Sequence, residues 1–181
     1  WDPGSGLRFD PTRVLLDPYA RGTAVPDGYR RTAAWEPADA SVPMKSVVVD
    51  TSRYDWEGDR PLVQPFRETI VYEAHLAGFT KHPSSGVAPE RRGTYAGFIE
   101  KIPYLVDLGV TAVEFLPVFQ FDAQTAPEGL TNYWGYQTVS FFAPPAAYAT
   151  RPAPLVAVDE CRDLVKALHR AAVGAGLPPD A

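Results

Sequence analysis

The chain has 181 residues, a length that allows one domain, or one domain and a small part of another. Its formal net charge of −5, from 17 basic and 22 acidic residues, gives no electrostatic reason to bind nucleic acid or an anionic membrane. The hydrophobic content of 45% is typical of a globular protein, and no apolar run approaches the roughly 20 residues that span a bilayer.

The cysteine content and the first residues both favour a cytoplasmic location. Cys161 is the one cysteine, which excludes a disulfide within the chain and suits a reducing compartment. The residues that follow Trp1 lack the basic region of a secretory signal, so we expect no signal peptide. Cys161 is in line with Leu164, Val165 and Leu168, and this spacing favours packing in a core over nucleophilic chemistry.

Residues 1–66 lack long periodic segments and are rich in turn formers, which predicts connecting structure laid over a larger body. One β-branched run, residues 45–50, predicts a short strand. Asp55, Glu57 and Asp59 then alternate as in a cation-binding loop. The position of Gly58 and the lack of a downstream carboxylate do not fit an EF-hand, so we predict a solvated acidic turn.

Residues 68–76 are short, β-branched and apolar, and they predict the first buried strand. A long loop is expected over 78–94, followed by a short turn at 95–101. The main helix should begin near Ile102, because Pro103 lacks an amide N–H and is tolerated only in a first helical turn. Gly109 is the expected stop of this helix.

Residues 110–116 predict a second apolar strand, and a loop of more than 30 residues follows it at 117–150. Residues 159–175 predict a second helix with Asp159 as its N-cap, closed by two glycines, Gly174 and Gly176. The resulting βαβα order indicates an α/β fold. Its strands are apolar enough to be buried on both faces of a parallel sheet.

The second long loop contains a dense aromatic stretch at residues 132–138. Three aromatic rings and two amide side chains surround one glycine, Gly135. Broad π-faces beside fixed hydrogen-bonding groups are what a sugar ring needs, and loops at the carboxyl ends of parallel strands usually hold the ligand. The alternative is a packed turn, because isolated aromatic clusters usually serve packing.

Glu73 and Glu114 fall in the two predicted strands. As a functional pair, they would be the two carboxylates that glycoside hydrolysis needs about 5–10 Å apart. We favour a structural interpretation, in which basic or hydroxyl groups inside the sheet pair with them. Catalytic groups in such folds lie at the carboxyl ends of strands, and Glu73 is in the middle of its strand.

The sequence predicts neither a cofactor nor a metal site. No glycine-rich phosphate loop follows either strand, and no Cys-x-x-Cys or His-x-x-x-His pair occurs. The histidines, His75, His82 and His169, are spread along the chain.

Six motifs in order are similar to those of one enzyme family. They are residues 45–50, 54–59, 70–75 with 78–80, 92–97, 108–114 with 116–118, and 132–136. In these motifs the chain resembles the bacterial glycogen debranching enzymes of the isoamylase type. That family is part of the α-amylase superfamily, glycoside hydrolase family 13. The resemblance extends from about Gly6 to about Arg170.

The resemblance implies a partial (β/α)8 TIM barrel, with its first two βα units, preceded by the end of a β-sandwich and a linker. Residues 1–66 would be the end of a carbohydrate-binding module 48 and the linker, and residues 67–181 the first part of the catalytic barrel. The family continues with a third strand that ends in Asp-x-x-x-Asn-His. Residues 174–181 hold two prolines and no apolar run, so we expect no third strand and a truncated or frameshifted chain.

The implied activity is retaining hydrolysis of the α-1,6-glucosidic branch linkages of glycogen or its limit dextrin. The nucleophile and the acid/base of the family would lie beyond the end of this chain, which would then be inactive alone. Tyr136 matches the tyrosine that stacks on the sugar beside the scissile bond, and Trp134 and Asn132 would line or brace that subsite. The alternatives are a branching or trehalose-releasing enzyme of the same family, or a non-catalytic glucan-binding remnant. Some α-amylases use calcium, but the sequence shows no ligand set for it.

Overall fold

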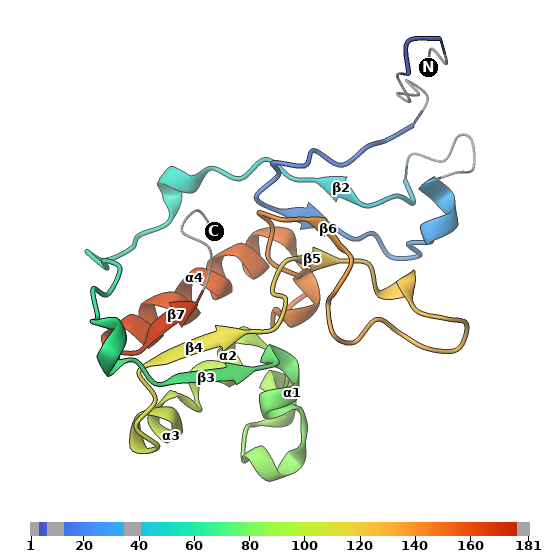
Figure 1. Cartoon of the computed structure of the whole chain (residues 1–181). Coiled ribbons are helices and arrows are strands. Elements are labelled where there is room, and N and C mark those ends of the chain that lie inside the picture. Colours follow the sequence, from blue (N-terminus) through green and yellow to red (C-terminus); the bar gives the residue numbers. More distant parts are fainter. Residues whose placement is uncertain (1–3, 7–12, 35–40, 177–181) are drawn as a thin grey trace.

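The computed structural model describes residues 4–6, 13–34 and 41–176. Its centre is a parallel sheet of three strands in the order β3-β4-β7, comprising β3 (Val71–Ala74), β4 (Ala112–Phe115) and β7 (Gly174–Gly176). The predicted parallel pairing is confirmed. Figure 1 shows the sheet in the lower half of the molecule, with the N-terminal segment above it.

Strand β7 corrects the prediction that Gly174 and Gly176 only close a helix and that no third strand forms. Three residues are enough for pairing because the ladder uses backbone groups alone, and the N–H of Gly174 donates to the carbonyl of Thr111 at 2.8 Å. Pro178 and Pro179, which argued against a strand, come after this pairing. Residues 177–181, and with them the predicted ending of the chain, lie outside the described residues.

Between β3 and β4, the observed helices agree with the predicted ones only from residue 95 onward. Helix α2 (Tyr95–Ile99) is followed by α3 (Ile102–Asp107), so the predicted break before Pro103 is confirmed. Gly109 has a φ of 83° and follows the helix as expected. The predicted loop at 78–94 is wrong in part, because helix α1 (Leu76–Lys81) forms there, with His75 as its N-cap.

The last helix, α4 (Pro154–Arg170), begins five residues before the expected start. Pro154 occupies the first turn, where the missing amide N–H costs no hydrogen bond. Asp159 is therefore inside the helix instead of capping it. None of the helices in the described residues is long and apolar enough to cross a membrane.

The long loop at 117–150 has structure of its own. Strand β5 (Gln120–Phe121) pairs antiparallel with β6 (Thr138–Ser140). In the N-terminal segment, β1 (Thr23–Ala24) pairs with β2 (Lys45–Ser46), so only the first two residues of the predicted strand at 45–50 are paired. Short 3₁₀ turns connect these elements: Arg31–Ala34, Thr51–Arg53, Phe66–Glu68, Pro83–Ser85, Pro89–Arg91, Ala123–Thr125 and Ala146–Tyr148.

The core lies between the sheet and the helices. Tyr95, Phe98, Leu105 and Leu168 are each 0% exposed, and Val113 of β4 points toward them. Alternate residues of the strands point the other way, and Val71 is 52% exposed. The prediction of strands buried on both faces is therefore wrong within the described residues, because helices cover one face only.

The segment with Asp55, Glu57 and Asp59 contains the predicted turn, and Asp55 and Glu57 are exposed to solvent. It is attached to α4. Glu57 accepts hydrogen bonds from Lys166 at 2.7 Å and Arg170 at 2.5 Å, and Asp59 lies 2.8 Å from Nδ1 of His169. These contacts hold the N-terminal segment against the last helix.

The Glu57 contacts predict an acid-sensitive attachment. The hydrogen bond from Lys166, and then that from Arg170, lowers the pKa of Glu57. A carboxyl whose folded pKa is depressed stabilises the fold above its unfolded pKa of about 4.3, and this contribution is lost as the pH falls through the folded pKa. Glu57→Gln should lower the thermal unfolding midpoint at pH 7 and make little difference at pH 3. The exposed Glu90, changed to Gln, is the control, and an equal effect of both variants at pH 7 would contradict the prediction.

Candidate functional site

The three predicted site residues lie on one loop between β5 and β6. Its path begins beyond the carboxyl end of β4, which is where ligand loops of parallel sheets are found. Trp134 is 55% exposed and Tyr136 is 58% exposed. Two of the predicted residues therefore present large aromatic rings to solvent from one short stretch.

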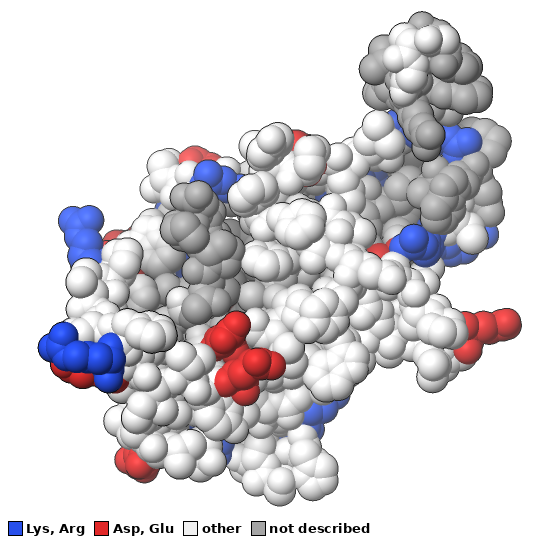
Figure 2. Space-filling view, viewed as in Figure 1, with Lys and Arg blue, Asp and Glu red and all other residues white. Residues whose placement is uncertain are grey.

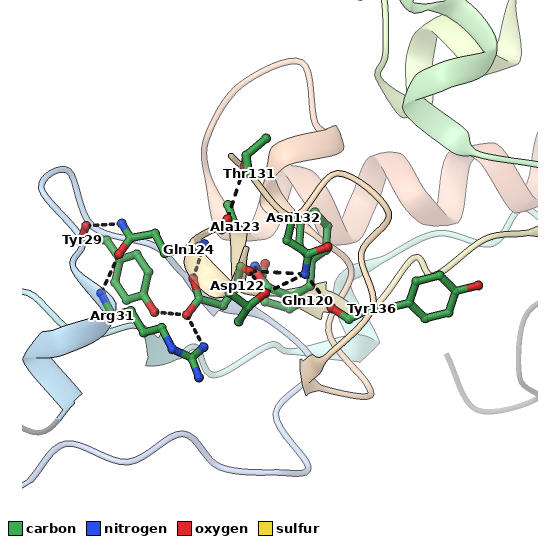
Figure 3. A network of polar contacts seen from close by, with 11 residues as sticks. Tyr29, Arg31, Gln120, Asp122, Ala123, Gln124, Thr131, Asn132 and Tyr136 are labelled. Atoms are coloured by element: carbon green, nitrogen blue, oxygen red, sulfur yellow. Dashed lines mark hydrogen bonds and ion pairs between the residues drawn. The ribbon is translucent and has the colours of Figure 1, made fainter. Parts of the chain in front are cut away.

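The side chain of Asn132 is occupied within the loop itself. Its Nδ2 donates to the carbonyl of Tyr136 at 2.6 Å and to Oγ1 of Thr125 at 2.9 Å, and its Oδ1 accepts from the N–H of Gly135 at 3.2 Å (Figure 3). A side-chain amide can donate from its nitrogen and accept at its oxygen at the same time. Of the two roles expected for Asn132, these contacts provide the brace.

Gly135 is required at the turn that Asn132 closes. Its φ of 80° is in the left-handed region, which residues with a side chain rarely adopt. A Cβ atom placed there would also lie 3.0 Å from the carbonyl oxygen of Pro117. The loop therefore packs directly against the chain that leaves β4, and Trp134 and Tyr136 stand on either side of this close approach.

His75 connects the loop to the central sheet, a role that the sequence analysis missed. Its Nδ1 accepts from the N–H of Gly78 at 2.9 Å, so the neutral ring carries its hydrogen on Nε2 and donates it to the carbonyl of Tyr133 at 2.9 Å. The His75 ring also stacks on Tyr133, with centroids 4.4 Å apart and planes at 10°. Histidine is not among the residues usually found at N-caps, so the sequence offered no standard signal for this one.

Tyr133 is used for packing. Its hydroxyl lies 2.8 Å from where a Cβ atom of Gly78 would be, so only glycine lets the ring lie against α1. Trp134 meets the His75 ring edge-on, with centroids 5.7 Å apart. Tyr133 is 43% exposed, and the two rings that face solvent most are those of Trp134 and Tyr136. We call this pair, with the loop that carries it, the aromatic wall.

Glu73 and Glu114 are directly paired in the register of β3 and β4, which places their backbones about 4.8 Å apart. Both are exposed on the uncovered face of the sheet, and acidic side chains lie over these strands in Figure 2. Neither carboxylate has a hydrogen-bond or ion-pair partner in the described part of the chain. The predicted pairing with basic or hydroxyl groups is therefore wrong there.

A separate cavity of about 530 Å³ lies between the N-terminal segment and α4. Its lining includes Tyr19, Trp56, Phe142 and Cys161, and none of the three predicted site residues. Burial raises the pKa of the Cys161 thiol to about 12, which keeps it protonated and fits the packing role predicted for it. Among the residues that the structure describes, no group of three His, Cys, Asp or Glu could hold a metal ion.

The chain is similar to known proteins over nearly its whole length, although no protein-family model matches it. It is 42% identical to a glycogen debranching enzyme of Cronobacter sakazakii and 44% identical to one of Klebsiella pneumoniae, in both cases over 96% of the chain. The chain is homologous to part of the bacterial glycogen debranching enzymes. It spans 27% of the length of each of these two relatives.

A solved structure is also similar to this chain. The product complex of SpuA, a multi-modular glycogen-degrading pneumococcal virulence factor, is 28% identical, with a TM-score of 0.73. The similarity covers 89% of this chain and 18% of SpuA. The arrangement of strands, helices and loop described above is thus shared with a glycogen-degrading protein.

The role of Asn132 predicts a loss of stability when its amide is removed. Asn132→Ala leaves the N–H of Gly135 and the carbonyl of Tyr136 without their partner, which should lower the free energy of unfolding by about 1–3 kcal/mol. Urea unfolding followed by circular dichroism measures this change. Glu128→Ala, at an exposed position of the same loop, is the control, and equal unfolding midpoints for the two variants would show that the brace is not needed.

Proposed function

We propose that the chain is part of a glycogen debranching enzyme and that the aromatic wall forms one side of its α-glucan subsite. The main support for this proposal is the pair of exposed rings, Trp134 and Tyr136, on a loop that Asn132 and His75 hold in place. The 42–44% identity to glycogen debranching enzymes supports the substrate class. The reaction would be hydrolysis of α-1,6-glucosidic branch linkages.

Exposed aromatic rings suit a glucan because the C–H faces of a glucose ring are apolar and flat. The ring of Tyr136 offers a stacking face, and its hydroxyl can exchange a hydrogen bond with the sugar. Holding the loop before the ligand arrives reduces the entropy lost on binding. The contacts of Asn132 and His75 therefore favour a preformed subsite over one that orders around its ligand.

Within this proposal the chain binds and positions substrate. Retaining hydrolysis needs a nucleophile and an acid/base about 5–5.5 Å apart beside the scissile bond. Glu73 and Glu114 are each the third of four strand residues and lie on the sheet, not on the loop that carries the rings, so we assign neither to catalysis. The catalytic carboxylates would belong to parts of the enzyme that the much longer relatives contain.

The same proposal gives the chain a place in a larger fold of the isoamylase type. The parallel strands β3, β4 and β7, with helices on one face, would be the start of a (β/α)8 barrel. The uncovered face with Glu73 and Glu114 would then line the barrel interior. Residues 1–66 would be the last edge of a carbohydrate-binding module 48 and its linker, and the single cysteine supports a cytoplasmic enzyme.

The proposal predicts that glycogen binding depends on Tyr136. In co-sedimentation with glycogen, Tyr136→Ala should weaken binding about tenfold, because the stacking face and its apolar area are lost together. Phe66→Ala is the matched control, since Phe66 is an aromatic ring that is 92% exposed outside the site. Failure of the wild-type chain to sediment with glycogen, or equal binding of both variants, would contradict the proposed subsite.

A further inference from the structure

We propose that Tyr29 and Arg31 of the N-terminal segment are positioning residues for the aromatic wall. Neither side chain lies on the wall, and both act through Asp122 at the base of the loop. The consequence for glucan affinity rests on the function proposed above. The consequence for the order of the loop does not.

Asp122 connects the N-terminal segment to the loop between β5 and β6. Its side chain is only 3% exposed, and a buried carboxylate requires compensating partners. The hydroxyl of Tyr29 donates to Oδ2 at 2.8 Å, and Nη1 of Arg31 donates to the same oxygen at 3.0 Å. The other oxygen, Oδ1, accepts from the N–H of Gln124 at 2.9 Å. Burial, and then the hydrogen bond to Asp122, raises the pKa of Tyr29, so the hydroxyl remains a donor.

Gln124 also binds the N-terminal segment, through the backbone of Tyr29 and Arg31. Its Nε2 donates to the carbonyl of Tyr29 at 2.9 Å, and its Oε1 accepts from the N–H of Arg31 at 2.7 Å. Two residues of the N-terminal segment thus face two residues of the loop, each pair using side chains and backbone together. A connection made of four such contacts fixes both the distance and the rotation of the two segments.

The connection continues from Asp122 to the wall. The N–H of Asn132 donates to the carbonyl of Ala123 at 2.9 Å, and its Nδ2 lies 3.4 Å from the carbonyl of Asp122. The same Nδ2 donates to the carbonyl of Tyr136 at 2.6 Å. Figure 3 shows this path from Tyr29 and Arg31, through Asp122 and Asn132, to Tyr136.

Polar contacts hold the loop at this end, and they include those from Oγ1 of Thr125 to the carbonyl of Asp122 and from Oγ1 of Thr131 to the carbonyl of Ala123. Residues 127–131 are exposed, including Leu130 at 70%, so few apolar contacts fix the segment between Asp122 and Asn132. Where buried apolar contacts are few, hydrogen bonds decide how often a segment opens. The polar path therefore has a direct effect on how well Tyr136 is placed.

The test uses Tyr29→Phe in the 181-residue chain, because this change removes one hydroxyl and keeps the ring. Amide hydrogen exchange without ligand should become about tenfold faster in peptides that cover residues 126–137, as expected for a lost hydrogen bond to a charged acceptor. Exchange in β3 and β4 should not change. The dissociation constant for maltoheptaose should rise about threefold or more. Arg31→Lys, which keeps the charge and loses the planar fork, should change both quantities in the same direction.

Tyr54→Phe is the matched control. The hydroxyl of Tyr54 also donates to a carboxylate, that of Asp163 at 2.6 Å, but on the side of the N-terminal segment that faces α4. Faster exchange at 126–137 in Tyr29→Phe and not in Tyr54→Phe supports the inference. Unchanged exchange there, or an equal increase in both variants or throughout the chain, overturns it.

The two readouts separate this inference from the proposed function. Faster loop exchange in Tyr29→Phe, with a wild-type chain that binds no maltoheptaose, supports the positioning of the loop and contradicts the glucan subsite. Faster loop exchange with unchanged affinity in a wild-type chain that does bind overturns the claim that Tyr29 and Arg31 position the wall for its ligand.

Discussion

A buried carboxylate has to be compensated inside the protein, and at Asp122 this requirement determines where the N-terminal segment lies. The compensating groups come from Tyr29 and Arg31, more than 90 positions earlier in the sequence. Without them Oδ2 of Asp122 would lose both of its partners in a site that is nearly closed to water, and the buried charge would be poorly compensated. The position of the N-terminal segment and the order of the β5–β6 loop are thus two results of one electrostatic constraint.

The N-terminal segment is also attached to α4. There Nζ of Lys166, a side chain of α4 that is 8% exposed, donates to Oε1 of Glu57 at 2.7 Å. Both attachments are made of charged and polar groups, and the cavity of about 530 Å³ lies between the segment and α4. Directional contacts therefore hold the segment at more than one place, including the hydrogen bond from Thr23 to Gln120 at 3.0 Å. Directional contacts specify an orientation, which is what the wall requires from its support.

The sequence predicts those elements whose signals are local. The break before Pro103 and the stop at Gly109 follow from backbone chemistry, and the apolar run at 110–116 contains β4. Helix α1 was missed because six residues carry no visible periodicity, and its start depends on the Nδ1 of His75. Strand β7 was missed for the opposite reason. Its three small residues have no strand propensity, and they pair because β4 offers a free edge.

The sequence of residues 132–138 indicates where the aromatic wall lies, but it does not indicate which side chains brace the loop and which face solvent. The sequence shows rings and amides side by side, and a sugar site uses both, so Asn132, Trp134 and Tyr136 look equivalent there. The structure shows that Asn132 uses its amide on its own loop, and that Tyr133 is committed to His75. What the wall offers to a ligand is then the faces of Trp134 and Tyr136, with few fixed polar groups. Stacking faces accept a glucose ring with little demand on its hydroxyls, so recognition of a particular linkage has to come from polar groups outside this loop.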